Sequence, residues 1–142
     1  MSTMRGPLVY LEHDVEDQEH LKEVLETLKI KNELKVFDNC KSALEYLRTT
    51  KDHIFLIISD IKFPGMDGFT LREEILKDKA LKKKTIPYVF LTDYADQPSI
   101  DRAYDLEVQG FFEKEGSTIR MALIIKQVLD YWASCKHPNS FR

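Results

Sequence analysis

The sequence predicts an α/β fold in which helices cover both faces of one parallel sheet of five strands. Short apolar runs alternate along the chain with longer segments of helical periodicity, and this alternation favours right-handed βαβ crossovers. The run at 54–58 is apolar without a break, which is typical of a central strand buried on both faces. The chain has 142 residues, 43% hydrophobic and 32% charged, which is the size and composition of one globular domain.

Five short apolar runs, each bounded by polar residues, are predicted to form the strands. In chain order they occupy residues 8–11, 34–37, 54–59, 88–91 and 110–112.

Each predicted strand is followed by a segment whose apolar residues have the spacing of a helix. In the first of these segments Leu21, Val24 and Leu28 recur at the spacing of one helical face. Ala43 and Leu47 give a shorter version of the same pattern, and residues 121–132 give a longer one. Residues 67–79 and 98–106 are predicted to form the third and fourth helices. Residues 137–142 are predicted to form a loose tail.

Charge and targeting signals exclude several classes of protein. With 21 Lys and Arg against 24 Asp and Glu, the net charge of −3 argues against binding of nucleic acid over the whole surface. The first six residues do not resemble a signal peptide, and no apolar run reaches the length of about 18 residues needed to span a membrane. Cys40 and Cys135 are interpreted as free thiols, so a cytoplasmic location is expected.

Polar side chains follow the predicted strands at the edge where ligands bind in parallel sheets. In chain order they are Glu12, His13, Asp14, Asp60, Thr92, Asp93 and Lys114. Carboxylates, a hydroxyl and an ammonium suit a divalent cation and a phosphoryl group, and a carboxylate can form an aspartyl phosphate. Singly, each has a structural explanation: Asp14 can cap a helix, and Asp60 opens a loop rich in turn signals. Their joint placement after four strands of one sheet favours a common site for a divalent cation and a phosphoryl group.

The same segments resemble the receiver domain of two-component response regulators. The resemblance is carried by LVYLEHD at 8–14, IISD at 57–60 with PGMDGF at 64–69, IPYVFLT at 86–92 and GFFEK at 110–114. It implies a flavodoxin-like (βα)5 three-layer sandwich with strand order 2-1-3-4-5. The receiver would occupy residues 7–133, with short tails at 1–6 and 134–142 and no output domain.

The resemblance implies a role for each site residue. Asp60 would accept a phosphoryl group from the phosphohistidine of a sensor histidine kinase or phosphotransfer protein. Glu12, Asp60 and the backbone carbonyl of Lys62 would hold Mg²⁺. Thr92 and Lys114 would bind the phosphoryl oxygens. The protein would then be a signalling module rather than a turnover enzyme, catalysing at most its own phosphorylation and dephosphorylation.

The resemblance also implies how the signal would leave the domain. Phe111 would act as an aromatic switch that follows Thr92. Phosphorylation adds about −1.5 to −2 charges, which would bias a two-state surface formed by the fourth helix, the fifth strand and the fifth helix. A downstream protein target would bind this face, and the domain would be a monomer or a homodimer through it. Neither nucleic acid nor a membrane is an expected partner.

Three residues depart from the family pattern. His13 replaces the usual second acidic residue, and it could be a neutral spacer, a partner of Asp60 or a ligand for a softer metal. Because a carboxylate ligand is lost, the affinity for Mg²⁺ is expected to be lower. Asp93 replaces a small residue and could repel a phosphoryl group. Glu115 replaces a proline, so the Lys114–Glu115 peptide bond is either trans, with an altered loop, or a strained cis bond.

Two other functions stay open. A degenerate receiver would be an interaction module that does not depend on phosphorylation. A small hydrolase of the flavodoxin-like fold is the third hypothesis. The haloacid dehalogenase type is disfavoured because Lys62 stands where a second Asp is needed.

Overall fold

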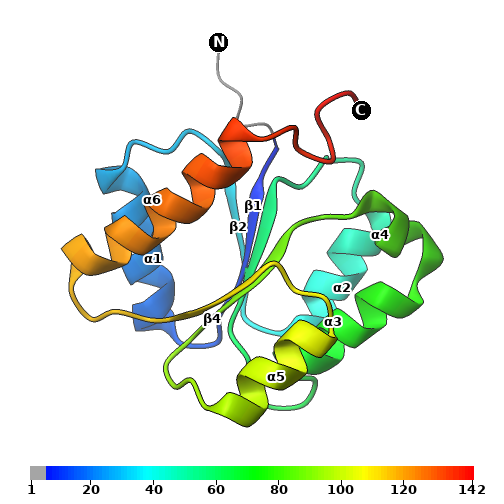
Figure 1. Ribbon diagram of the computed structural model, residues 1–142, viewed down its shortest axis with the longest axis horizontal. Coiled ribbons are helices and arrows are strands. Elements are labelled where there is room, and N and C mark those ends of the chain that lie inside the picture. Colours follow the sequence, from blue (N-terminus) through cyan, green and yellow to red (C-terminus); the bar gives the residue numbers. More distant parts are fainter. Residues whose placement is uncertain (1–5) are drawn as a thin grey trace.

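The computed structural model describes residues 6–142 and contains one five-stranded sheet of order β2-β1-β3-β4-β5 (Figure 1). All neighbouring strands are parallel. The strands are β1 (Leu8–Leu11), β2 (Leu34–Phe37), β3 (Leu56–Ser59), β4 (Tyr88–Thr92) and β5 (Gly110–Glu113). The predicted fold class and strand order are therefore confirmed. Of the predicted amino-terminal tail, residues 1–5 lie outside the described residues.

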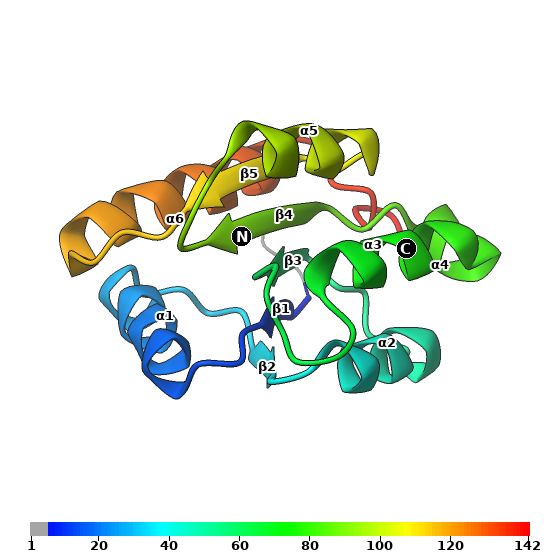
Figure 2. The same ribbon diagram turned by 90° about the horizontal axis from the view of Figure 1, so that it is seen from below.

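Helices form a layer on each face of the sheet (Figure 2). One face is covered by α1 (Val15–Thr27) and α6 (Thr118–Ser134). The other is covered by α2 (Cys40–Thr49), α3 (Gly68–Lys77), α4 (Lys79–Lys84) and α5 (Gln97–Asp105). Within the described residues, no helix is long and apolar enough to cross a membrane.

The central strand β3 contributes to two separate hydrophobic cores. Leu56 and Ile58 belong to the core beneath α1 and α6, whereas Ile57 belongs to the core beneath α2 and α3. All three side chains are at most 2% exposed. This double burial is the physical reason for the unbroken apolar run in the sequence, because successive side chains of a strand point to opposite faces.

Polar residues at the helix amino termini define where the helices begin. Each cap side chain accepts a hydrogen bond from a backbone N–H three residues later, which satisfies one of the N–H groups left unpaired at a helix start. The caps are Asp14, Asn39, Asp67, Asp78, Asp96 and Ser117.

The third predicted helix, at residues 67–79, corresponds to α3, which ends at Asp78, and a further helix that was not predicted, α4, begins directly after it. This residue has an extended backbone, its N–H donates to the Glu74 carbonyl, and its side chain accepts the N–H of Leu81. One aspartate therefore ends one helix and caps the next. The structure has six helices in the described residues, so the predicted fourth and fifth helices are α5 and α6.

The carboxy-terminal segment is bound to the domain, and the prediction of a loose tail is wrong. His137 and Asn139 are each 6% exposed. The His137 ring stacks on Phe55 at 4.7 Å, and its Nε2 lies 2.6 Å from the Phe55 carbonyl oxygen. Asn139 Nδ2 donates to the carbonyl of His53 at 3.2 Å. The tail thus satisfies backbone carbonyls of the chain that leads into β3.

Candidate functional site

Four of the predicted site residues converge at the carboxyl ends of the strands, the edge that faces the viewer in Figure 2. Glu12 follows β1, Asp60 follows β3, Thr92 ends β4 and Lys114 follows β5. Glu12, Asp60 and Thr92 are 2%, 6% and 5% exposed, and the Lys114 side chain is 7% exposed. Buried charges of this kind are stable only when they are paired.

The Lys114 ammonium lies at the centre of this cluster. Its Nζ is 2.6 Å from Glu12 Oε1, 2.8 Å from Asp60 Oδ2 and 2.8 Å from Asp17 Oδ2. Asp93 Oδ2 lies farther away, at 3.6 Å, on a side chain that is 77% exposed. Each of the three close carboxylates therefore accepts a charge-assisted hydrogen bond from one cation.

The same contacts determine the protonation of the cluster. Burial alone would lower the pKa of Lys114, but hydrogen bonds to Asp17, Asp60 and Glu12 outweigh it and hold the pKa above its ordinary value. Burial raises the pKa of Glu12, although hydrogen bonds from Lys114 and the Asp14 N–H oppose this shift. The site therefore retains an ammonium next to the Asp60 carboxyl group at neutral pH.

Backbone groups fix the Asp60 carboxylate. Its Oδ1 accepts the N–H of Ile61 at 2.7 Å, and its own N–H donates to the Leu11 carbonyl at 2.9 Å. The following loop folds back onto Asp60 at Gly68, where a Cβ atom would lie 2.2 Å from the Asp60 carbonyl oxygen. No side chain fits at this position without displacing backbone. The turn-rich loop after Asp60 therefore packs the first turn of α3 directly against the Asp60 backbone.

Glu12 is held from three directions. Its Oε1 accepts the Tyr10 hydroxyl at 3.2 Å, and its Oε2 accepts the N–H of Asp14 at 3.1 Å. Gln18 of α1 donates to the Glu12 carbonyl at 2.7 Å. These bonds tie the carboxylate to both β1 and α1.

Asp17 belongs to the charged cluster but was not among the predicted site residues. It lies in the first turn of α1, and its backbone N–H donates to the Asp14 cap at 3.1 Å. The cap therefore orients the turn from which the Asp17 side chain reaches Lys114, 97 residues away in sequence. An acidic residue in a first turn normally indicates only helix-dipole stabilisation. Only the positions of β5 and α1 in the fold reveal its second role.

Among the remaining predicted residues, Asp14 contacts the cluster through its N–H, which donates to Glu12, and through its side chain, which accepts the N–H of Asp17. His13, Asp14 and Lys62 are exposed, and His13 takes no part in the hydrogen bonds that Asp60 makes among the described residues. Phe111 is half-buried and its ring lies 6.1 Å from that of Phe90. The Lys114–Glu115 peptide is trans, because residues 6–142 contain no cis bond.

The oxygen donors near Asp60 are of the type that Mg²⁺ prefers. Magnesium commonly binds through one or two carboxylates, with water and phosphate oxygens completing its shell. Glu12 and Asp60 supply two such carboxylates, so the donor set fits this ion. Across residues 6–142, no three or more His, Cys, Asp or Glu side chains are grouped so as to hold a metal. The cation that joins the carboxylates here is the Lys114 ammonium.

Comparison with known sequences finds one family. The model of the response regulator receiver domain matches residues 11–126. Response regulator Rcp1 of Synechocystis is 24% identical over 130 residues, covering 88% of this chain and 87% of that protein. The Fimbriae Z protein of Salmonella typhimurium is 33% identical over 92 residues, covering 65% of this chain and 41% of that protein. The chain thus spans about two fifths of the first curated relatives it matches.

Solved structures give the same result for the fold. The phosphorylated cyanobacterial phytochrome response regulator RcpA superposes with a TM-score of 0.79 at 25% identity, covering 92% of this chain and 95% of that one. The Mn²⁺-bound form of Rcp1 has a TM-score of 0.75 at 24% identity, covering 91% and 95%. A receiver domain from Rhodospirillum rubrum has a TM-score of 0.78 at 23% identity, covering 93% and 96%.

Proposed function

Because this chain belongs to the family of response regulator receiver domains, we propose that it accepts a phosphoryl group on Asp60 from a histidine kinase or phosphotransfer protein. The observation that carries the proposal is the contact of Lys114 with Asp60, in a buried cluster that Thr92 borders. A carboxylate nucleophile, a cation and a hydroxyl are the groups that phosphoryl transfer requires at one place.

The proposed reaction is an in-line transfer. A carboxylate oxygen of Asp60 forms a bond to phosphorus while the bond between phosphorus and the histidine nitrogen breaks. The other ring nitrogen of the phosphohistidine carries a proton, so the imidazole departs neutral with the electron pair of that bond, and an acyl phosphate remains on Asp60. Because charge accumulates on the three equatorial oxygens, catalysis consists mainly of positioning and charge neutralisation. Lys114 would neutralise one of these oxygens, and the Thr92 hydroxyl would donate to another.

Lys114 must share its hydrogen bonds differently once the phosphoryl group is present. In the unphosphorylated site its ammonium group binds the carboxylates of Glu12, Asp17 and Asp60 at the same time. A phosphoryl oxygen would replace the Asp60 carboxylate as its partner, and Asp17 would compete for the ammonium. Mg²⁺, when bound, supplies further positive charge to the phosphoryl oxygens. It would be held by Glu12, Asp60 and the Lys62 carbonyl, with weaker affinity because His13 removes one carboxylate.

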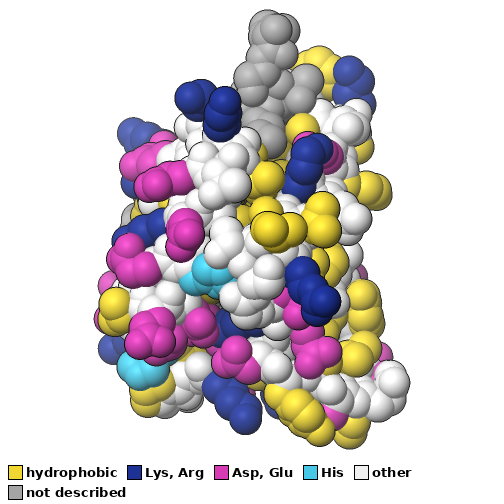
Figure 3. Space-filling view, turned by 90° about the vertical axis from the view of Figure 1, so that its left-hand side faces the viewer, with side chains coloured by type: hydrophobic (Ala, Val, Ile, Leu, Met, Phe, Trp, Pro, Cys, Tyr) yellow, Lys and Arg dark blue, Asp and Glu magenta, His cyan; other side chains and the backbone are white. Residues whose placement is uncertain are grey.

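The proposed output surface is the face formed by α5, β5 and α6. Large hydrophobic side chains are exposed on it, including Tyr104 at 50%, Leu123 at 58% and Tyr131 at 64%. Figure 3 views the side of the molecule with α1 and α6, where acidic side chains gather mainly on the left and hydrophobic ones mainly on the right. We propose that a downstream protein or a second copy of this chain binds the hydrophobic part. Phe111 and Thr92 would transmit the state of Asp60 to it.

The proposal is tested by incubating the protein with acetyl phosphate and Mg²⁺ and measuring its intact mass. The expected result is the gain of one phosphoryl group that hydroxylamine removes, because hydroxylamine cleaves acyl phosphates. Asp60→Asn should abolish the gain. Asp105→Asn is the matched control, since Asp105 is an exposed residue at the end of α5. An equal gain in the Asp60 variant would assign the phosphoryl group to another residue.

The same experiment separates the alternatives. A degenerate receiver is favoured by one observation, that the Lys114 charge is already neutralised by internal carboxylates. Such a protein would gain no mass with any phosphoryl donor or metal. A hydrolase would instead release phosphate continuously from a small phosphoester. His13→Asp should increase Mg²⁺ affinity if the missing carboxylate weakens it, and unchanged affinity would contradict that reasoning.

A further inference from the structure

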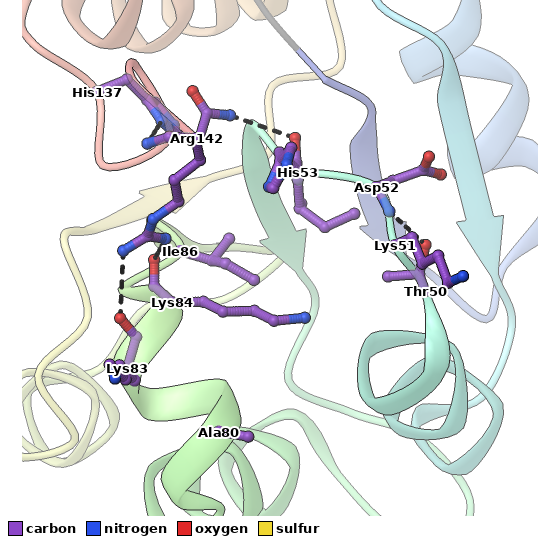
Figure 4. A pocket seen from close by; sticks show the side chains of 12 residues that line it. Thr50, Lys51, Asp52, His53, Ala80, Lys83, Lys84, Ile86, His137 and Arg142 are labelled. Atoms are coloured by element: carbon purple, nitrogen blue, oxygen red, sulfur yellow. Dashed lines mark hydrogen bonds between the residues drawn. The ribbon is translucent and has the colours of Figure 1, made fainter.

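A cavity lies at the amino-terminal edge of the sheet, opposite the cluster around Asp60 (Figure 4). Its volume is about 460 Å³. Three parts of the chain form its walls: residues 50–54 before β3, residues from Ala80 to Ile86 at and after α4, and the tail from His137 to Arg142. Pockets that bind small molecules measure about 300–1,000 Å³, so the size is sufficient for one.

The walls of this cavity are positively charged although the chain is acidic. Lys51, Lys83, Lys84 and Arg142 line it together with a single acidic side chain, Asp52, in a protein of net charge −3. Figure 4 shows the Lys84 side chain extending across the cavity toward the segment before β3, and the Asp52 carboxylate directed away from it. The potential inside the cavity therefore favours an anion.

One of these charges is fixed in place. The Arg142 guanidinium donates to the carbonyl of Lys84 at 2.7 Å and to that of Lys83 at 3.4 Å. These carbonyls belong to the last turn of α4, where backbone oxygens have no partner within the helix. Arg142 thus closes one wall and holds a positive charge there. Lys84 is half-buried and supplies a second charge that can move toward a ligand.

The rest of the lining is largely apolar. Ile54 is 3% exposed and Ile86 is half-buried, and both contact the cavity together with Ala80. The buried polar side chains of the tail are directed to backbone, because His137 binds the Phe55 carbonyl and Asn139 binds that of His53. The lysine methylene chains add apolar surface below their charged ends.

We propose that this cavity binds a small organic anion, consisting of an apolar body and one negatively charged group. The apolar body would contact Ile54, Ile86 and Ala80, and the charged group would be bound by Lys84 with Lys51 or Arg142. The inference is independent of phosphoryl transfer, because the cavity shares no residue with the cluster around Asp60.

The test uses 8-anilinonaphthalene-1-sulfonate, which has fused aromatic rings and one sulfonate and which fluoresces when bound at an apolar site. Titration into the full chain should give a saturable rise in fluorescence. Lys84→Gln should increase the Kd about two- to fivefold, the range for loss of one partly exposed ionic contact. Lys82→Gln is the matched control, because Lys82 lies on the same helix but does not line this cavity. Its Kd should match that of the unmodified chain.

A second variant shows whether the probe occupies this cavity. Ala80→Trp should fill the space from α4 and abolish binding, and its circular dichroism melting curve should confirm that it folds. N-phenyl-1-naphthylamine, the uncharged analogue, should bind without sensitivity to Lys84→Gln. The proposal is overturned by absence of saturable binding, by equal effects of the two lysine variants, or by binding that survives in a folded Ala80→Trp protein. Survival would place the probe elsewhere, for instance on α6.

Discussion

Replacing Lys114 by Met should destabilise the protein strongly, and the structure gives the size of the effect. The change leaves two carboxylates, Glu12 and Asp60, without their cation while their side chains are 3% and 9% exposed. Removing one partner of a buried ion pair costs about 3–5 kcal/mol. Asp17, with 31% of its side chain exposed, can be hydrated, so we expect the lower end, about 3 kcal/mol. For a domain of this size the midpoint of thermal unfolding should fall by roughly 6–12 °C.

The loss should depend on pH with a definite sign. Lys114 has a raised pKa in the folded protein, so its stabilising effect is present throughout the neutral range and is lost only as the pH rises toward the folded pKa. In the variant, Glu12 loses the Lys114 hydrogen bond that opposes the effect of burial, so its pKa would rise further and it would bind a proton more readily when folded. Its burial then costs less as the pH falls toward about 4, the ordinary value for carboxyl groups. The deficit should therefore be larger at pH 8 than at pH 5.

Urea unfolding followed by circular dichroism at both pH values measures this deficit. Lys126→Met is the control, because Lys126 forms an exposed pair with Asp130 whose side chains are 60% and 55% exposed. That variant should lose less than about 1 kcal/mol. A deficit below about 1 kcal/mol for Lys114→Met, or one that grows toward pH 5, would refute the view that Lys114 compensates buried charge.

Three further changes test other parts of the structure. Asp17→Asn should leave Lys114 freer to bind a phosphoryl oxygen, so acetyl phosphate should phosphorylate the variant about two- to fivefold faster, and a slower reaction would contradict this competition. Gly68→Ala should reduce stability by more than about 1 kcal/mol in urea unfolding, because its Cβ would meet the Asp60 carbonyl at 2.2 Å; an unchanged midpoint would show that the loop can relax. Burial lowers the pKa of His137, so folding stability should fall as the pH drops below about 6.5, and His137→Gln should lessen this loss between pH 7.5 and 5.5 in thermal melts.

Much of the fold follows from local patterns in the sequence. The apolar run before Asp60 predicted a doubly buried strand because its side chains must satisfy two cores, and Leu56, Ile57 and Ile58 do so. The division between α3 and α4 was not predictable in the same way. Asp78 follows a helical pattern and precedes another, and its dual use as a terminator and a cap depends on backbone geometry. Apolar periodicity is insensitive to a break that leaves the buried face aligned.

The candidate site was predictable to the extent that topology alone brings residues together. Glu12, Asp60, Thr92 and Lys114 follow parallel strands, so their convergence follows from strand order. Asp17 could not be found this way, since it lies on a helix and its contact with Lys114 depends on how α1 packs beside the end of β5. The bound tail was missed for a related reason. His137 and Asn139 are buried by hydrogen bonds to backbone carbonyls, which leave no trace in side-chain patterning.

The attachment of Arg142 to the end of α4 has a practical consequence for measuring binding. The first described residue, Gly6, precedes β1, so both described ends lie at the edge of the sheet remote from Asp60 (Figure 1). A protein tethered to a sensor surface through its amino terminus would present the Asp60 edge to a kinase in solution. Tethering through the carboxy terminus would orient it similarly but would pull on the Arg142 contacts. Amino-terminal immobilisation is therefore the orientation that leaves both the Asp60 edge and the cavity beside Arg142 undisturbed.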